Sequence, residues 1–134
     1  MNEPQPTAAL FVGMQGSESV VVRPELTVRH HKPDMPAVYG TPMMIYLMEV
    51  AAANAIHPHL PAGWVSVGAS VNIRHLAATP LGRTVTATAV VTEIKDRLVS
   101  FRIEAHDGVR KIGDGTHARG VIHLATFEER LEKA

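Results

Sequence analysis

Two ionisable side chains stand in unusually apolar surroundings. Glu49 is the single charge in the run from Met43 to Ile56, where an ionised carboxylate is costly unless it is paired or hydrogen-bonded. Such an acid either lies on a solvent-exposed stripe of a helix or acts in an active site as nucleophile or general base. His75 shares strand parity with Val71 and Ile73, so it lies toward an apolar face, either as a core histidine or as a proton-transfer group.

Thr41 precedes the same apolar run and is predicted to be the N-cap of a helix, with Pro42 at the first helical position. The amides of a helix N-terminus also suit an oxyanion that develops from a carbonyl group. Thr41 and Glu49 are eight positions apart, about 12 Å along a straight helix, which is too far for a direct hydrogen bond. Either the Thr41 loop folds back, or a second copy supplies the partner group. We favour a homodimer with sites at its interface.

One helix and several strands must position these residues. The helix is predicted from Pro42 to Ile56 and, being apolar nearly all round, should be buried all round. Strands are predicted over Ser19–Arg23, Leu26–His30, Val65–Arg74, Thr84–Ile94, Leu98–Ala105 and Ile112–Leu124. Asp107-Gly108 is a two-residue hairpin signal. An antiparallel sheet wrapped around one central apolar helix buries that helix most simply, so an α+β hotdog fold is predicted.

Length, charge and composition limit the class of protein. The 134 residues suit one domain spanning residues 1–134, with residues 1–16 as a loose lead-in. Thirteen basic and thirteen acidic residues balance, so no general attraction to nucleic acid or to a membrane is expected. The chain has no cysteine and His57-Pro58-His59 lacks further ligands at metal spacing, so neither metal nor cofactor is expected. Without a signal-like start or a span-length apolar stretch, a cytoplasmic protein is predicted.

Three runs of residues, in order, resemble the fluoroacetyl-CoA thioesterase-like family of hotdog thioesterases. They are TPMMIYLMEVAA, SVGASVNIRHLAATPLG and FRIEAHDGVRKIGDGTHARGVIHL, and the resemblance spans about Leu26 to Phe127. The combination of HxAATPxG with AHDGxxxIGxGTHxR is specific. The resemblance implies hydrolysis of a small acyl-CoA thioester to a carboxylate and free CoA, where CoA is part of the substrate.

The same resemblance implies roles for individual residues. It makes Thr41, Glu49 and His75 catalytic, places Gly68 near the thioester, and gives Arg119 a contact with CoA. Sequence leaves open whether Glu49 acts as nucleophile, through a mixed anhydride, or as general base on water.

The segment before the helix departs from the name-giving members, which carry a longer, aromatic-rich lid. Here ten residues separate His30 from Thr41, Tyr39 is the sole aromatic, and Met35 stands where those members place an aromatic residue. We therefore expect little preference for a fluorinated acyl group.

Two rival functions remain at this point. A hotdog hydratase or dehydratase acting on a CoA thioester would use an Asp/His pair on a loop beside the helix, and the Asp34 region offers no match. A catalytically silent acyl-CoA-binding module would lack Glu49 or His75, and both are present.

Overall fold

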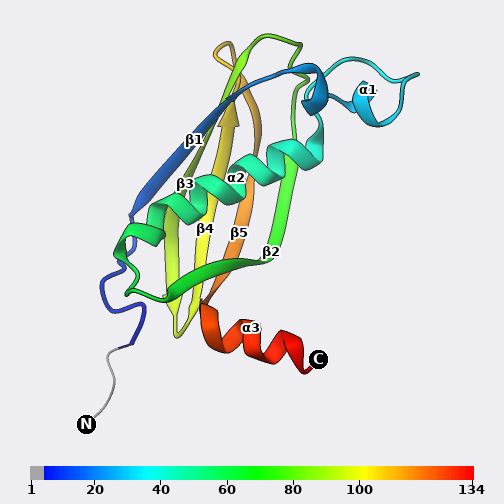
Figure 1. The fold of residues 1–134 in the computed structure, drawn as a ribbon. Coiled ribbons are helices and arrows are strands. Elements are labelled where there is room, and N and C mark those ends of the chain that lie inside the picture. Colours follow the sequence, from blue (N-terminus) through cyan, green and yellow to red (C-terminus); the bar gives the residue numbers. More distant parts are fainter. Residues whose placement is uncertain (1–4) are drawn as a thin grey trace.

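The computed structural model describes residues 5–134 (Figure 1), so the first four residues of the expected lead-in lie outside the described range. The strands are β1 (Gln15–Val21), β2 (Trp64–His75), β3 (Thr84–Lys95), β4 (Leu98–His106) and β5 (Lys111–His123). The helices are α1 (Val28–His31), α2 (Thr41–Ile56) and α3 (Leu124–Glu132), and the 3-10 turns are η1 (Pro24–Leu26) and η2 (His57–His59).

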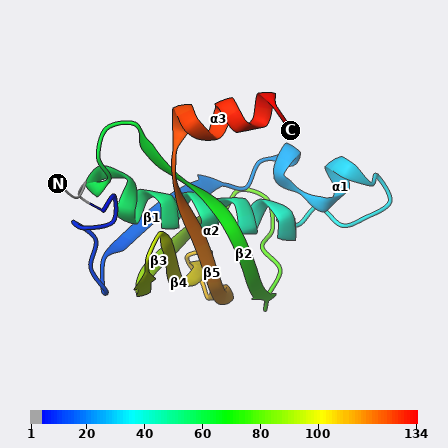
Figure 2. The same cartoon turned by 90° about the horizontal axis from the view of Figure 1, so that it is seen from below.

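The strands of the described residues form one antiparallel sheet in the order β1-β3-β4-β5-β2. Consequently β1 and β2 are its two edges. The sheet curls around α2, which crosses its concave face (Figure 2). The predicted α+β hotdog fold, a sheet wrapped around one apolar helix, is confirmed.

Helix α2 supplies one side of the hydrophobic core. Its buried residues are Met44, Leu47, Met48, Ala51, Ala52, Ala55 and Ile56. Burial all round was expected, but Tyr46 is 68% exposed because the sheet covers only one side of the helix. The facing core comes from alternate residues of β3 and β4, as period-two patterning requires; these are Val85, Ala87, Ala89, Val91, Val99, Phe101, Ile103 and Ala105.

The segment between β1 and α2 differs from the prediction. Pro24 lacks a backbone N–H for strand pairing, and Pro24–Leu26 and Val28–His31 form short helical turns instead of the expected strand. Residues 5–14 form no helix or strand, yet Leu10 and Met14 are buried in the core. This part of the lead-in is therefore packed against the domain.

The C-terminal part of the chain also differs in detail. Strand β5 ends at His123, and Leu124 begins α3, a helix that the strand pattern did not predict. The hairpin between β4 and β5 is confirmed, with Gly108 at a φ of 88°. Its loop is longer than the two residues expected and runs over residues 107–110.

Candidate active site

Thr41 and His75 meet in a direct hydrogen bond. The Thr41 Oγ1 atom lies 2.7 Å from His75 Nδ1. The prediction that Thr41 is the N-cap is wrong: Gly40 is the N-cap, and Thr41 is the first helical residue. The hydroxyl is therefore free to turn toward the end of β2, where His75 is the last residue.

The other ring nitrogen of His75 is ready for a ligand. Nε2 is buried and has no hydrogen-bond partner among residues 5–134. Burial lowers the pKa of His75 below its usual value, so the ring is neutral at pH 7. A neutral imidazole with one free nitrogen can accept or deliver a proton there.

A cleft of about 360 Å³ opens beside the Thr41–His75 pair. Its wall combines small and apolar side chains with these two polar ones, from Val28, Val38, Tyr39, Thr41, His75, Leu76, Ala77 and Ala78. The cleft therefore has the composition of a site for a small, mostly apolar group.

Glu49 lies two turns further along α2, beside Gly68 and Arg119. A Cβ atom added to Gly68 would sit 3.1 Å from Oε2 of Glu49, so the absence of a side chain there makes room for the carboxylate. The Oε2 atom lies 3.7 Å from Nη1 of Arg119. With a side chain that is 34% exposed, Glu49 is neither fully buried nor free in solvent.

Arg119 is held by protein contacts at every guanidinium nitrogen. Its Nε donates to Ser66 Oγ at 2.8 Å and its Nη2 to the Ser66 carbonyl at 2.9 Å. Its Nη1 lies 3.2 Å from His117 Nε2, which can accept because His117 Nδ1 faces the carbonyl of Ser70 at 2.8 Å. At 7% exposed, Arg119 is therefore enclosed by the protein and presents little surface to a ligand. Its contact with CoA stays a prediction.

A β-bulge in β2 places Gly68, the residue beside Glu49, and His75 on the same face of the strand. Gly68 pairs with Arg119 and Ser70 with Ala118, so Ala69 is an extra residue. The bulge reverses the alternation at this point, and Gly68 shares the α2-facing side with Val71, Ile73 and His75. Ser66, rather than Val65 or Val67, therefore meets Arg119 on that side.

Known proteins resemble this chain over almost its whole length. The family described as fluoroacetyl-CoA-specific thioesterase matches residues 22–125. A fluoroacetyl-CoA thioesterase of Streptantibioticus cattleyicolor is 42% identical over 91% of this chain and 92% of its own length. The chain belongs to this family.

Solved structures agree with this assignment. The fluoroacetyl-CoA thioesterase FlK superposes with a TM-score of 0.86 at 42% identity, over 92% of this chain and 96% of FlK. A hot-dog-like protein of Thermanaerovibrio acidaminovorans gives a TM-score of 0.86 at 24% identity, covering 95% of this chain and 94% of its own, and shows the fold alone. The chain is thus a hotdog-fold acyl-CoA thioester hydrolase.

Asp107 supports the end of the sheet where Thr41 and His75 meet, a role that the sequence, which indicated only a turn there, did not predict. Its carboxylate is buried and accepts hydrogen bonds from the Thr79 hydroxyl, from Arg83 and from two backbone amides of its own loop. The Thr79 carbonyl in turn accepts from the Tyr39 amide at 2.9 Å. Asp107 thereby connects the segment after His75 to the segment before Thr41. A lone Asp-Gly pair carries no signal for so distant a partner.

Met35 lies in the exposed loop between α1 and α2 and is 37% exposed. Its carbonyl accepts a hydrogen bond from Arg29 Nε at 2.7 Å. It does not line the cleft beside Thr41 and His75, so its contact with an acyl group stays a prediction. Within residues 5–134 no group of three metal-ligating side chains comes together, and no helix there is long and apolar enough to cross a membrane.

Proposed function

We propose that this thioesterase hydrolyses a small acyl-CoA at a site built from Thr41 and His75 of one copy and Glu49 of a second copy. The observation that carries the proposal is the Thr41–His75 hydrogen bond of 2.7 Å beside a cleft, with His75 Nε2 left without a partner. The relatives named above are fluoroacetyl-CoA thioesterases, which supports a short acyl group. The cytoplasm remains the expected location.

The proposed chemistry assigns one task to each group. The thioester carbonyl lies near the N-terminus of α2, whose amides and Thr41 hydroxyl stabilise the developing oxyanion. Glu49 either attacks the carbonyl or removes a proton from the attacking water. His75 donates its Nδ1 proton to Thr41 Oγ1, which leaves the Thr41 hydroxyl proton for the oxyanion. Its Nε2 takes up the proton released by the water, directly or through Glu49, and passes it to the departing CoA sulfur. Water and thioester thus become a carboxylic acid and free thiol.

Arg119 and Gly68 then hold the Glu49 carboxylate in position. Arg119 offsets the negative charge of Glu49 from 3.7 Å, and its fixed contacts with Ser66 keep that charge in place. Gly68 leaves space at the same point for the reacting group.

Glu49 of the same copy is too distant for this chemistry. Thr41 and Glu49 lie eight positions apart on one helix, about 12 Å along the axis. His75 is fixed to Thr41 by its hydrogen bond. A second copy is therefore needed to complete the site.

Strand β2 offers the surface for that copy. It is a twelve-residue edge strand, and a long edge with unpaired backbone groups favours pairing with another strand. Val67 and Val71 are 38% and 37% exposed along it. Antiparallel pairing of β2 with β2 of a second copy forms a closed, two-fold dimer.

The bulge in β2 suggests the register of that pairing. A two-fold axis through Asn72 puts Arg74 opposite Ser70 of the second copy. The extra residue then puts His75 opposite Gly68, and both lie on the α2-facing side. Since Glu49 packs against Gly68, its carboxylate comes next to the other copy's Thr41 and His75.

The test combines two inactive variants in one dimer. Glu49→Gln and His75→Ala each disable both sites of a homodimer. A heterodimer isolated by two affinity tags after co-expression retains one intact pair of groups, so it is expected to release free thiol from acetyl-CoA or fluoroacetyl-CoA at about half the wild-type rate.

The controls identify which part of the proposal fails. The doubly tagged wild-type dimer sets the reference rate, and a heterodimer carrying both substitutions in one chain keeps no intact site, with each site lacking one group. An inactive mixed heterodimer would contradict the shared site. Failure of the wild-type protein to release thiol from any short acyl-CoA would contradict the substrate class.

A further inference from the structure

A small pocket lies at the end of the sheet opposite the Thr41–His75 cleft. It has a volume of about 110 Å³ and lies between the β3–β4 turn, the end of β5 and α3. Its lining combines basic, hydroxyl and aromatic side chains, from Arg97, Val121, Ile122, His123, Thr126, Phe127 and Arg130. No carboxylate belongs to this lining, so the pocket has the charge of an anion site.

The two arginines are available to a ligand. Neither forms an ion pair with any carboxylate of residues 5–134, although α3 carries Glu128, Glu129 and Glu132. Three other arginines contrast with this, since Arg74, Arg83 and Arg119 are paired with acids.

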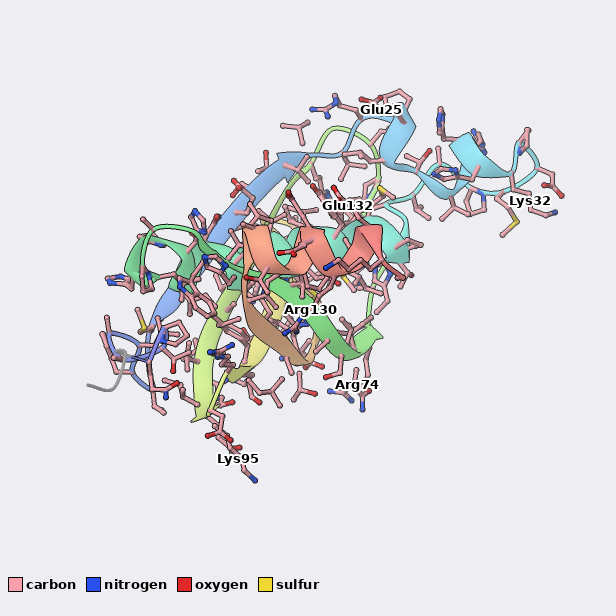
Figure 3. The ribbon with its side chains drawn as sticks, turned by 60° about the horizontal axis from the view of Figure 1, so that its bottom comes forward. Glu25, Lys32, Arg74, Lys95, Arg130 and Glu132 are labelled. Carbon is pink, nitrogen blue, oxygen red and sulfur yellow. The ribbon has the colours of Figure 1, made fainter. Side chains whose placement is uncertain are left out.

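Arg97 is held in place, and Arg130 lines the same pocket from α3. The Arg97 guanidinium stacks over the Trp64 ring, with Cζ 4.7 Å from its centroid, a contact that restrains the side chain while leaving its N–H groups free. Figure 3 shows Arg130 on the side of α3 toward the sheet, whereas Glu132 points the other way. Two cations, one of them preorganised, therefore converge on one pocket.

The pocket lies on the same face as Glu49. Val121 and His123 alternate with Arg119 on the α2-facing side of β5, and His123 pairs with Trp64 of β2. Trp64 and Gly68 lie four positions apart on β2, about 13 Å of strand. An extended pantetheine arm covers a comparable length, so a CoA thioester whose carbonyl lies near Gly68 brings its phosphates to this end.

From this geometry we infer that Arg97 and Arg130 bind the phosphate groups of the CoA nucleotide, with Phe127 beside them as an aromatic surface. The inference rests on the proposed function, because it takes Glu49 and Gly68 to mark the thioester. It also gives the nucleotide a partner distinct from Arg119, whose nitrogens all contact protein.

The test compares substrates with and without the nucleotide. Arg97→Ala combined with Arg130→Ala is expected to raise KM for acetyl-CoA by about tenfold or more, since each charge-assisted contact to phosphate is lost. The kcat should change by less than about twofold, because the contact is similar in ground and transition states. KM for acetyl-pantetheine should not change.

Matched variants separate a specific site from general charge. Arg102→Ala removes an exposed arginine on the outer face of β4 and should leave both KM values unchanged. Arg130→Gln alone alters only the exposed helix α3 and should give a smaller rise, so it keeps the test valid if loss of the Arg97–Trp64 contact harms folding. An unchanged KM for acetyl-CoA, an equal rise for both substrates, or an equal effect of Arg102→Ala would overturn the inference.

A binding measurement distinguishes failure of the phosphate site from failure of the proposed thioester hydrolysis. Calorimetric titration with 3′-phospho-ADP, the nucleotide portion of CoA, should show binding to the wild-type protein and to Glu49→Gln. The Arg97/Arg130 double variant should bind it at least about tenfold more weakly, and inorganic phosphate at the same concentration should not compete fully. If the protein hydrolyses no thioester but binds this nucleotide through the two arginines, the proposed function fails while the phosphate site stands.

Discussion

Gly68→Ala probes the position of the Glu49 carboxylate directly. The added Cβ would lie 3.1 Å from Oε2 and 3.4 Å from both Cδ and Oε1 of Glu49. The carboxylate must therefore move by a few tenths of an ångström. A misplacement of about 1 Å can cost about 10²-fold in rate, so this shift should lower kcat by about 3- to 10-fold, up to 1.4 kcal/mol of barrier.

Gly120→Ala is the matched control. It makes the same chemical change on the neighbouring strand β5, and its Cβ would meet no atom within 4 Å. Neither glycine has the left-handed φ that would strain an alanine. Both substitutions should therefore leave the protein folded, with the free energy of unfolding unchanged or raised by about 0.4–1 kcal/mol through the unfolded chain.

The assay is steady-state thiol release at pH 7 with one short acyl-CoA, alongside urea unfolding of both variants. Gly120→Ala should match the wild type in kcat, and Gly68→Ala alone should be slower. A kcat for Gly68→Ala within about twofold of the control, with equal stability, would refute the reasoning that the Glu49 carboxylate works at this point.

Three further predictions concern protons, stability and selectivity. Because burial lowers the pKa of His75, the acidic limb of the kcat/KM profile that is due to this ring should lie below pH 6.5. A pH–rate profile with this limb at or above pH 6.5 would contradict the assignment. His75→Ala should cut turnover by about 10²-fold or more. Asp107 has a pKa lowered to about 2, because its hydrogen-bond donors outweigh its desolvation, so its contribution to stability is present above pH 3.8 and is lost as the pH falls toward 2. Asp107→Asn should therefore lower the free energy of unfolding at pH 7 by about 1–3 kcal/mol, and this free energy should depend less on pH in acid than it does for the wild type. Equal unfolding curves of the wild type at pH 7 and pH 3 would contradict this. Fluoroacetyl-CoA should be preferred over acetyl-CoA by no more than pocket fit allows, about 1–3 kcal/mol, and a ratio of kcat/KM above about 10⁴ would show that selectivity does not depend on the loop around Met35.

The main elements could be predicted because their patterns are local. The apolar run after Pro42 specifies α2 to within one residue at its start, and alternation along β3 and β4 specifies strands that bury every second residue. Pro24 illustrates the limit of this reasoning, since apolar residues after it continued the strand pattern while the backbone turned into short helices. Helix α3 could not be predicted from a pattern of core residues, because none of its residues is fully buried.

The candidate site depends on contacts that local patterns do not encode. A threonine before a helix follows the capping rule, but its hydroxyl is taken by His75, 34 residues away. Spacing left Arg119 open as a surface cation, whereas Ser66 and His117 enclose it. Each of these partners comes from a different segment, so only the assembled sheet brings them together.

The bulge at Ala69 connects these observations. Gly68, Ala69 and Ser70 are small and give no apolar signal, so regular alternation from Val65 to Ile73 was the natural interpretation of the sequence. In a regular strand Gly68 would face away from α2, and a side chain at position 67 or 69 would meet Glu49 instead. With the same two-fold axis, His75 of a second copy would then oppose position 69 instead of Gly68, since opposite residues of an antiparallel pair point the same way. One extra residue therefore gives both the space beside the carboxylate and the register by which a second copy can reach it.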